Sequence, residues 1–185
     1  MPRAGLDAHA VVEAAAELAD ADGLPGLTLA RLADRLGVRS PSLYAHVDGL
    51  EDLRRRLAVK GVHDLTAALQ AAAVGRAGVD ALAAIASAYR AYAREHPGTY
   101  AALQRSSDVA ADPEAAAQLV AVVVAVLRGY GIDGDDAVHA TRIVRSALHG
   151  FVALEAEDGF GIPLDLDESF GRLVATLDRG LQTSA

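Results

Sequence analysis

The chain has 185 residues, enough for one large or two small domains with a hydrophobic core. It contains no cysteine, which excludes disulfide bonds and thiolate metal sites. The N-terminus lacks a signal-type apolar region, and the longest apolar run, residues 119–127, is too short to span a membrane. We therefore expect a cytoplasmic protein with no membrane partner.

The net charge is −8, which for the whole chain disfavours a polyanionic partner. The acidity is uneven, because residues 1–60 carry eight Lys or Arg against nine Asp or Glu. Most of the negative charge therefore lies beyond residue 60. Hydrophobic residues make up 52% of the chain and aromatic residues only 4%, with alanine abundant throughout. Alanine favours closely packed helices and no alternating β-branched run is present, so we expect an all-α fold.

The first predicted helix covers residues 7–21. Its apolar residues fall on one stripe at helical spacing: Ala10, Val11, Ala14, Ala15 and Leu18. The helix is expected to end in the run Asp22-Gly23-Leu24-Pro25-Gly26, which is rich in helix breakers.

Residues 27–47 have the pattern of two short helices joined by a tight turn. The first helix has one apolar face, formed at helical spacing by Leu29, Leu32, Ala33 and Leu36. Gly37 can adopt the positive φ at which a helix ends. Ser40 followed by Pro41 predicts a new helix, with Ser40 as its side-chain cap and Pro41 at the first helical position.

The second helix of this pair presents two different faces. Leu43 and Val47 are four residues apart and can pack against the first helix. The remaining side chains near its start carry hydrogen-bonding groups and are expected to be exposed: Ser40, Ser42, Tyr44 and His46. This is the end that a recognition helix presents to base edges in the major groove.

These segments resemble the DNA-binding domain of TetR-family transcriptional regulators over roughly the first third of the chain. The resemblance is carried by Thr28-Leu29, Leu32-Ala33, Leu36-Gly37-Val38, Leu53 and, most specifically, Ser42-Leu43-Tyr44-Ala45-His46-Val47. It implies contacts to double-stranded DNA, mainly to phosphates from Thr28, Tyr44 and His46 and to bases from Ser40, Pro41 and Ser42, with Arg39 nearby. The alternative is a helical hairpin that packs in a bundle without binding DNA.

A long fourth helix is predicted to run to about residue 73, with Asp48 as its cap and Glu51 as the reciprocal partner. The cluster Arg54, Arg55, Arg56 and Lys60 near its start is either a solvated face or includes one contact to the DNA backbone. The TetR family commonly has a lysine at the position of Leu50, where it contacts a phosphate. The leucine removes that contact here.

Five further helices are predicted, for about nine in all, over residues 79–95, 99–104, 113–130, 136–157 and 168–181. His96-Pro97-Gly98 separates the first two of them. Asp133 or Asp135 is expected to cap the helix that begins at residue 136. The resulting domains are a three-helix helix-turn-helix DNA-binding domain, residues 1–50, and a helical bundle for ligand binding and dimerisation, residues 51–185.

A ligand pocket is predicted where tyrosines cluster, because a tyrosine has an apolar body and a polar tip. The candidate residues are Tyr89, Tyr92, His96, Tyr100, Arg142 and His149. Arg142 matters because a buried guanidinium needs an anion. It therefore either faces a cavity for an acidic ligand or forms a salt bridge to one of the many carboxylates. The identity of the small-molecule effector cannot be deduced from these residues.

The helix of residues 136–157 has two apolar stripes, one with Ile143, Ala147, Phe151 and Leu154 and one with Val144, Leu148 and Val152. Its His149-Gly150 segment resembles the TetR C-terminal class named for a Trp-His-Gly motif, with leucine in place of tryptophan. The family forms homodimers through its last two helices, which here implies interface residues Leu148, Phe151, Phe170, Leu173, Val174 and Leu177. The alternative is that the last helix closes the core of one protomer.

Other kinds of site are not indicated. His139, His149 and Glu155 are not spaced to bind a metal from one helix face, and no cofactor or catalytic motif is present, so we expect neither a cofactor nor an enzyme. The resemblance instead implies a homodimeric repressor that a small-molecule effector releases from a palindromic operator. The alternative function is a helical small-molecule sensor with weakened DNA affinity, as Leu50 and the nearly neutral N-terminal region suggest.

Overall fold

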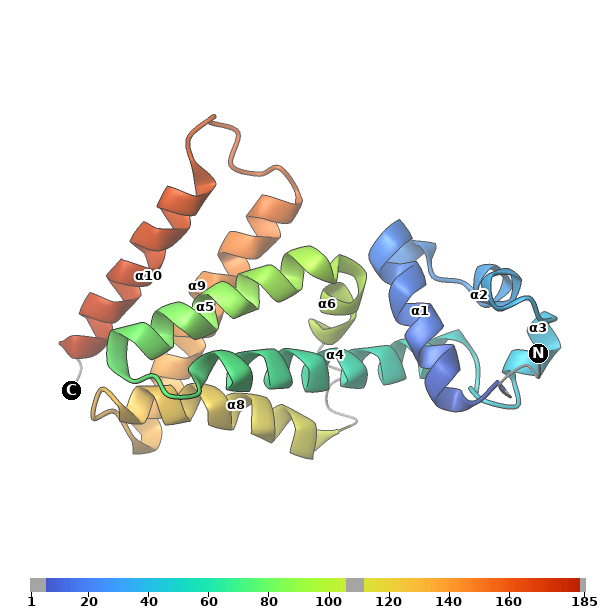
Figure 1. Cartoon of the computed structure of the whole chain (residues 1–185), viewed down its shortest axis with the longest axis horizontal. Coiled ribbons are helices and arrows are strands. Elements are labelled where there is room, and N and C mark those ends of the chain that lie inside the picture. The colour runs from blue at the N-terminus through green and yellow to red at the C-terminus, as the bar shows by residue number, and fades with distance from the viewer. Residues whose placement is uncertain (1–5, 106–111, 184–185) are drawn as a thin grey trace. The chain divides into compact units, whose positions relative to one another are not determined.

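A computed structural model describes residues 6–105 and 112–183, and every regular secondary-structure element in these ranges is a helix (Figure 1). It contains a 3-10 helix, Leu24–Gly26, and nine α-helices in the described ranges. Their bounds are α1 Ala8–Asp22, α2 Leu29–Leu36, α3 Ser40–Leu43, α4 Leu50–Ala73, α5 Gly78–Glu95, α6 Pro97–Leu103, α8 Pro113–Arg128, α9 Gly134–Ala156 and α10 Leu166–Gln182. The predicted all-α class is confirmed. None of the helices described has the length and apolar character needed to cross a bilayer.

The chain divides into two compact units that are not continuous in sequence. The first contains residues 1–63 and 95–116, and the second contains residues 64–94 and 117–185. The predicted domain boundary after residue 50 coincides with the start of α4, whereas the units divide inside α4. The domain limits 1–50 and 51–185 stay a prediction.

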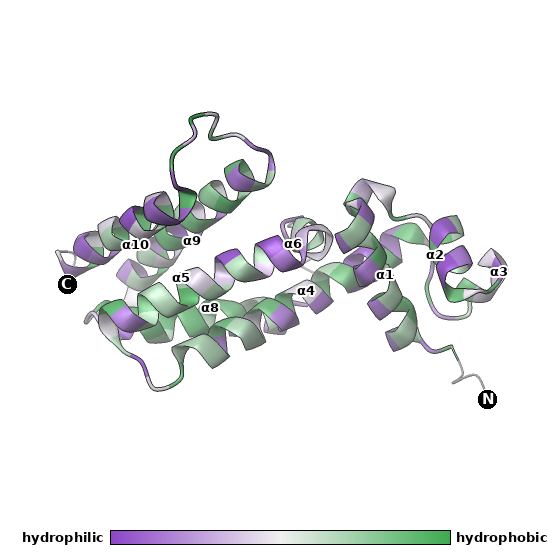
Figure 2. Cartoon of the chain, turned by 45° about the horizontal axis from the view of Figure 1, so that its top comes forward, coloured by the Kyte–Doolittle hydropathy of each residue, from purple (hydrophilic) through white to green (hydrophobic). Residues whose placement is uncertain are grey.

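The first unit is built around a small apolar core in which α1 packs on α2 and α6. Leu27, Leu32 and Leu43 are fully buried in it, as are Ala15 and Ala19 on α1. The small alanine side chains allow the helix axes to approach closely. Figure 2 shows α2 as alternating hydrophilic and hydrophobic segments, the pattern of an amphipathic helix with one face in this core.

Gly37 ends α2 in the left-handed conformation, with φ 67° and ψ 31°. The Gly37 N–H donates to the Asp34 carbonyl and the Val38 N–H donates to the Ala33 carbonyl, at 3.1 and 3.0 Å. This is the Schellman arrangement, which satisfies the last carbonyls of a helix. The predicted turn is therefore confirmed.

The predicted cap of the recognition helix is wrong. Arg39 occupies the N-cap position of α3, Ser40 is already helical, and no side chain caps the helix. Ser40 cannot act as an N-cap because its backbone lies inside the first turn, whereas a capping residue must be extended.

The connection between α3 and α4 depends on Asp52 rather than on the predicted Glu51. The Asp48 N–H donates to Asp52 Oδ2 at 3.0 Å, and Arg56 Nε donates to the same oxygen at 2.9 Å. Arg55 donates to the other oxygen. Burial disfavours the charged form of Asp52, but these donors outweigh it and lower the pKa of the carboxyl below its usual value.

Two other helix starts differ from the prediction. Pro97 occupies the first turn of α6, so that helix begins two residues earlier than expected and only His96 separates it from α5. Proline is favoured at this position because its missing N–H would have no partner there. Asp133 occupies the N-cap position of α9, without a side-chain capping bond.

The second unit contains a buried cation. Arg90 on α5 is 8% exposed and donates to both carboxylate oxygens of Glu155 on α9, at 2.9 and 2.5 Å. Its Nη1 lies 2.8 Å from Asp167 Oδ1 on α10. The guanidinium also lies 5.4 and 4.8 Å from the ring centres of Phe151 and Phe170. The charge is thus both paired and stacked, as a buried guanidinium requires.

The two predicted stripes of α9 have different environments. Val144, Leu148 and Val152 are all buried. In the other stripe, Ile143 is 59% exposed and Leu154 is 47% exposed, although Phe151 is buried. The helix therefore fills the core of its own unit with one stripe and leaves part of the other in solvent.

The left-handed turn at Gly37 can be tested with one substitution at two positions. Gly37→Ala is expected to lower the free energy of unfolding by about 1–2 kcal/mol, because an L-residue is strained at this φ while no atom obstructs the new methyl group. Gly171→Ala, in the open interior of α10, is expected to raise it by about 0.5–1 kcal/mol. Urea unfolding measures both, and a gain in stability for Gly37→Ala would contradict the turn.

The Arg90–Glu155 pair predicts a pH-dependent stability. The hydrogen bond from Arg90 lowers the pKa of Glu155 below its ordinary 4.5 despite burial, so the pair stabilises the folded state above that pH and the stabilisation is lost as pH falls through the lowered pKa. Glu155→Gln should cost on the order of 2 kcal/mol at pH 7, and the difference from wild type should shrink below about pH 4.

Glu168→Gln is the matched control for this test, because Glu168 forms an exposed pair with Arg172 on α10. Its effect should stay within about 0.5 kcal/mol. Urea unfolding at a series of pH values measures both variants, and equal stabilities of wild type and Glu155→Gln at pH 7 would contradict the role of the pair.

Candidate functional site

The predicted DNA-contacting residues form the surface of the helix-turn-helix at and after α3. Arg39, Pro41, Ser42 and Tyr44 are exposed, Tyr44 by 60% of its surface. Ser40 and His46 are half-buried, and Thr28 is exposed at the start of α2. These residues offer a guanidinium, hydroxyl groups, an imidazole and an aromatic ring, which are suitable groups for phosphates and base edges.

The backbone of this segment is fixed from behind by two buried anchors. Leu43 is fully buried and Val47 is 2% exposed. The Val47 N–H donates to the Leu43 carbonyl at 3.0 Å, which continues the helical turn beyond the four residues of α3. Because Leu43 points into the core, its neighbours Ser42 and Tyr44 are left at the surface.

Thr28 has a structural role as well as a predicted DNA contact. It is the N-cap of α2, and its Oγ1 accepts a hydrogen bond from the Arg31 N–H at 3.2 Å. A hydroxyl that accepts in this way can still donate its own proton. The N-terminus of α2 also carries the positive end of the helix dipole, which favours an anion such as a phosphate.

Most cations of this region are already neutralised by carboxylates. Arg31 pairs with Asp22 and Arg35 with Glu17, both at 2.6 Å. The other pairs are Arg54 with Glu51, Arg55 and Arg56 with Asp52, and Lys60 with Glu13. Among residues 6–63, Arg39 alone of the Lys and Arg side chains has no carboxylate at ion-pair distance. It is therefore the cation of the helix-turn-helix most available to DNA.

The six predicted ligand contacts lie in different environments. Tyr89 and Tyr92 on α5 are buried in the second unit, whereas His96 and Tyr100 belong to the first. Tyr100 is buried, and His96 is exposed with Nδ1 3.1 Å from Asp20 Oδ2. In the second unit, Arg142 is exposed and His149 is half-buried. Burial, together with the nearby charge of Arg145, lowers the pKa of His149.

The sequence suggested Arg142 as a candidate buried arginine, but Arg142 is exposed. The buried arginine is Arg90, which was not predicted. A signal was present, because Arg90 lies four residues after Ala86 and eight after Leu82 on the buried face of α5. An arginine on such an apolar stripe indicates a guanidinium that the fold must neutralise internally. Glu155 and Asp167 do so here.

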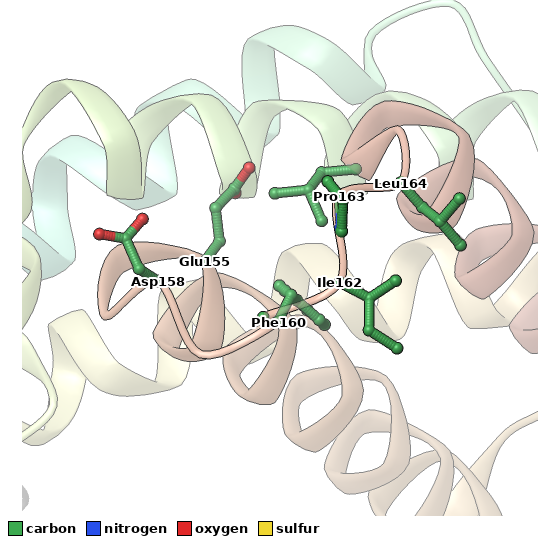
Figure 3. Close-up of a pocket in the computed structure, with 8 residues that line it drawn as sticks. Glu155, Asp158, Phe160, Ile162, Pro163 and Leu164 are labelled. Carbon is green, nitrogen blue, oxygen red and sulfur yellow. The ribbon is translucent and has the colours of Figure 1, made fainter.

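The connection between α9 and α10 lines a cavity of about 240 Å³ that is open to solvent (Figure 3). It is lined by Glu155, Asp158, Phe160, Gly161, Ile162, Pro163, Leu164 and Leu166. Ile162 and Leu164 are 71% and 72% exposed. Most of the lining side chains are apolar. Of the two carboxylates in the wall, that of Glu155 is already bound by Arg90. None of the six predicted ligand contacts lines this cavity.

The predicted dimerisation residues lie mostly inside one protomer. Leu148, Phe151, Phe170 and Val174 are between 3% and 8% exposed, and Leu173 and Leu177 are half-buried. The large apolar side chains at the surface of α9 are instead Val138, Ile143 and Leu154. The sequence does not distinguish them, because a helix with two apolar stripes does not reveal which stripe faces its own core.

Comparison with known proteins identifies the family. A family model described as tetracyclin repressor-like, C-terminal domain, matches residues 82–177. The chain is 42% identical over 182 residues to the HTH-type transcriptional regulator Rv0681 of Mycobacterium tuberculosis, covering 97% of this chain and 83% of the relative. It is 39% identical over 187 residues to the HTH-type transcriptional regulator YobS of Bacillus subtilis, covering 97% and 95%.

Solved structures show the same fold. The transcriptional regulator SCO7222, a TetR from Streptomyces coelicolor, superposes with a TM-score of 0.71 at 19% identity over 94% of this chain and 96% of that one. The assignment to the Trp-His-Gly class stays a prediction. The helix-turn-helix geometry, the C-terminal match and the full-length relatives agree, and the chain belongs to the TetR family of DNA-binding transcriptional regulators.

Proposed function

We propose that this regulator is a homodimeric repressor that binds a palindromic operator and is released by a small-molecule effector. The observation that carries the proposal is the exposed recognition surface, with Arg39 beside Ser42 and Tyr44, held from behind by buried Leu43 and Val47. A surface of this kind suits the major groove of double-stranded DNA. Thr28, Tyr44 and His46 would fix the register at phosphates, and Ser40, Pro41 and Ser42 would approach bases.

Dimerisation is proposed because one short recognition helix gives little specificity, whereas two related by a two-fold axis read both halves of a palindrome. The exposed Ile143 and Leu154 on α9, together with half-buried Leu173 and Leu177 on α10, support an interface on these two helices. The buried residues Leu148, Phe151, Phe170 and Val174 would support this face from within the protomer.

Release requires an effector that binds one state of the dimer more tightly than the other, since equal binding shifts nothing. Of the predicted contacts, those of the second unit are proposed for the effector: Tyr89, Tyr92, Arg142 and His149. Tyr89 and Tyr92 lie on α5 beside Arg90, which Glu155 on α9 and Asp167 on α10 hold. An effector that displaces α5 would therefore act on the helices of the proposed dimer interface.

The alternative, a small-molecule sensor with weakened DNA affinity, is favoured by the neutralised cations of the helix-turn-helix and by Leu50. Counterion release by Lys and Arg supplies much of the affinity of a protein for DNA. The two functions differ in one observable quantity, namely salt-sensitive binding to a specific palindrome. Fluorescence anisotropy with a palindrome selected from random-sequence DNA measures it directly.

Arg39→Ala is expected to weaken binding to that palindrome by about tenfold or more and to reduce its salt dependence, because it removes the available cation of each recognition helix. Arg35→Ala is the matched control, since Arg35 is held by Glu17, and should change the affinity by less than about twofold. An equal effect of the two substitutions would contradict the proposed role of Arg39.

The proposed interface predicts a change of oligomeric state. Ile143→Lys combined with Leu154→Lys should give a monomer in sedimentation experiments, because burying two unpaired ammonium groups is costly. The loss of the dimer should also abolish palindrome binding. Val79→Lys, at a site of α5 that is 49% exposed, is the control and should remain dimeric. A persistent dimer in the double variant would place the interface elsewhere.

A further inference from the structure

A close contact between distant parts of the first unit joins α1 to the start of α6. Asp20, on the last turn of α1, holds two groups at that start. Its Oδ1 accepts a hydrogen bond from the Thr99 N–H at 2.7 Å, and its Oδ2 lies 3.1 Å from His96 Nδ1. We infer that Asp20 is a positioning residue for DNA recognition, which fixes α1 and the helix-turn-helix that it braces to α6.

The backbones of the two helices meet without an intervening side chain. A Cβ atom built on Gly98 would lie 2.0 Å from the Ala19 carbonyl oxygen, far inside van der Waals contact. Ala19 is fully buried, and Thr99 is 2% exposed. The two backbones cannot move relative to each other by much without losing this contact, because packed interiors tolerate little displacement. A shift of the first turn of α6 must therefore move α1 with it or break the contact.

The path of the chain explains why this contact is a suitable place for control. The chain passes between the two units inside α4, inside α8 and between Arg94 and Glu95, the last residue of α5. The first two crossings lie within continuous helices. The third lies next to His96, a single non-helical residue with φ −128° and ψ 57°. The helix that carries Arg90 is therefore followed directly in sequence by His96, the residue that Asp20 holds.

On its other side, α1 is tied to α2 by ion pairs and packing. Arg35 on α2 pairs with Glu17 on α1, and Arg31 pairs with Asp22, both at 2.6 Å. Asp20 therefore completes a continuous set of contacts from α6 through α1 to α2, the helix that packs against the recognition segment. Without Asp20, we expect the helix-turn-helix to keep its own fold and to lose its fixed orientation.

Loss of Asp20 should change which spacings between the two half-sites of a palindrome the protein accepts. This expectation rests on the proposed dimeric function. Two rigidly held recognition helices accept one separation of half-sites, whereas loosely held ones accept several. Loss of Asp20 should therefore weaken binding to the correct palindrome and also make the protein tolerant of altered spacing. A simple loss of stability would weaken binding to both DNA molecules equally and leave their ratio unchanged.

The test compares two DNA duplexes, the palindrome that wild type selects from random-sequence DNA and the same palindrome with one base pair inserted at its centre. Wild type should discriminate between them. Asp20→Ala should bind the correct palindrome about 2- to 30-fold more weakly, the range typical of residues that couple sites, and the ratio of the two dissociation constants should fall towards one. His96→Ala, which removes one exposed contact, should give a smaller change in the same direction.

His9→Ala is the matched control, because His9 is 3.6 Å from Glu13 within α1 and its contact does not reach α6. It should behave as wild type. If Asp20→Ala folds and its ratio of dissociation constants for the two duplexes equals that of wild type, the inference is overturned. If Asp20→Ala does not fold, an unchanged ratio in His96→Ala overturns it. If the wild-type protein binds both duplexes equally, the proposed dimeric function is overturned. That result is obtained without any variant, so it is distinct from a failure of the inference about Asp20.

Discussion

The left-handed turn at Gly37 is the constraint on which the recognition surface depends. It closes α2 with two backbone hydrogen bonds and redirects the chain so that Leu43 and Val47 return to the core. Once these two residues are anchored, Ser42 and Tyr44 have no place except the surface. The chemistry offered to DNA thus follows from a backbone conformation that glycine adopts at little cost. The residues beyond it mainly hold, pair and orient this surface.

Most charged side chains described in the first unit form ion pairs within the protein and are therefore less available to attract DNA. Among residues 6–63, six ion pairs hold every Lys and Arg side chain except Arg39, and Asp52 and Asp20 each organise a junction between helices. The second unit repeats the pattern at Arg90, which joins α5 to α9 and α10. Such a design limits non-specific affinity for phosphates and leaves specificity to geometry. This accounts for a regulator with a net charge of −8.

Much of the fold could be predicted from the sequence, because helical periodicity and the breakers at Gly23, Gly37 and Pro97 are local signals. Failures occurred where tertiary contacts decide. Ser40 looked like a cap, but the backbone enters the helix one residue earlier, at Arg39. Arg142 and Arg90 both lie within predicted helices, and only packing shows that Arg90 is the buried one. The wide apolar arc of α9 likewise concealed that Leu148 faces its own core while Ile143 faces solvent.

Amide hydrogen exchange of the wild-type protein, free and bound to its selected palindrome, tests the central claim most directly, because it locates the DNA contact without any substitution. The account predicts slower exchange on DNA binding in residues 28–47, strongest from Arg39 to His46, with little change in α8. Unchanged exchange in that segment, with protection elsewhere in the chain, would contradict the claim that this helix-turn-helix reads DNA.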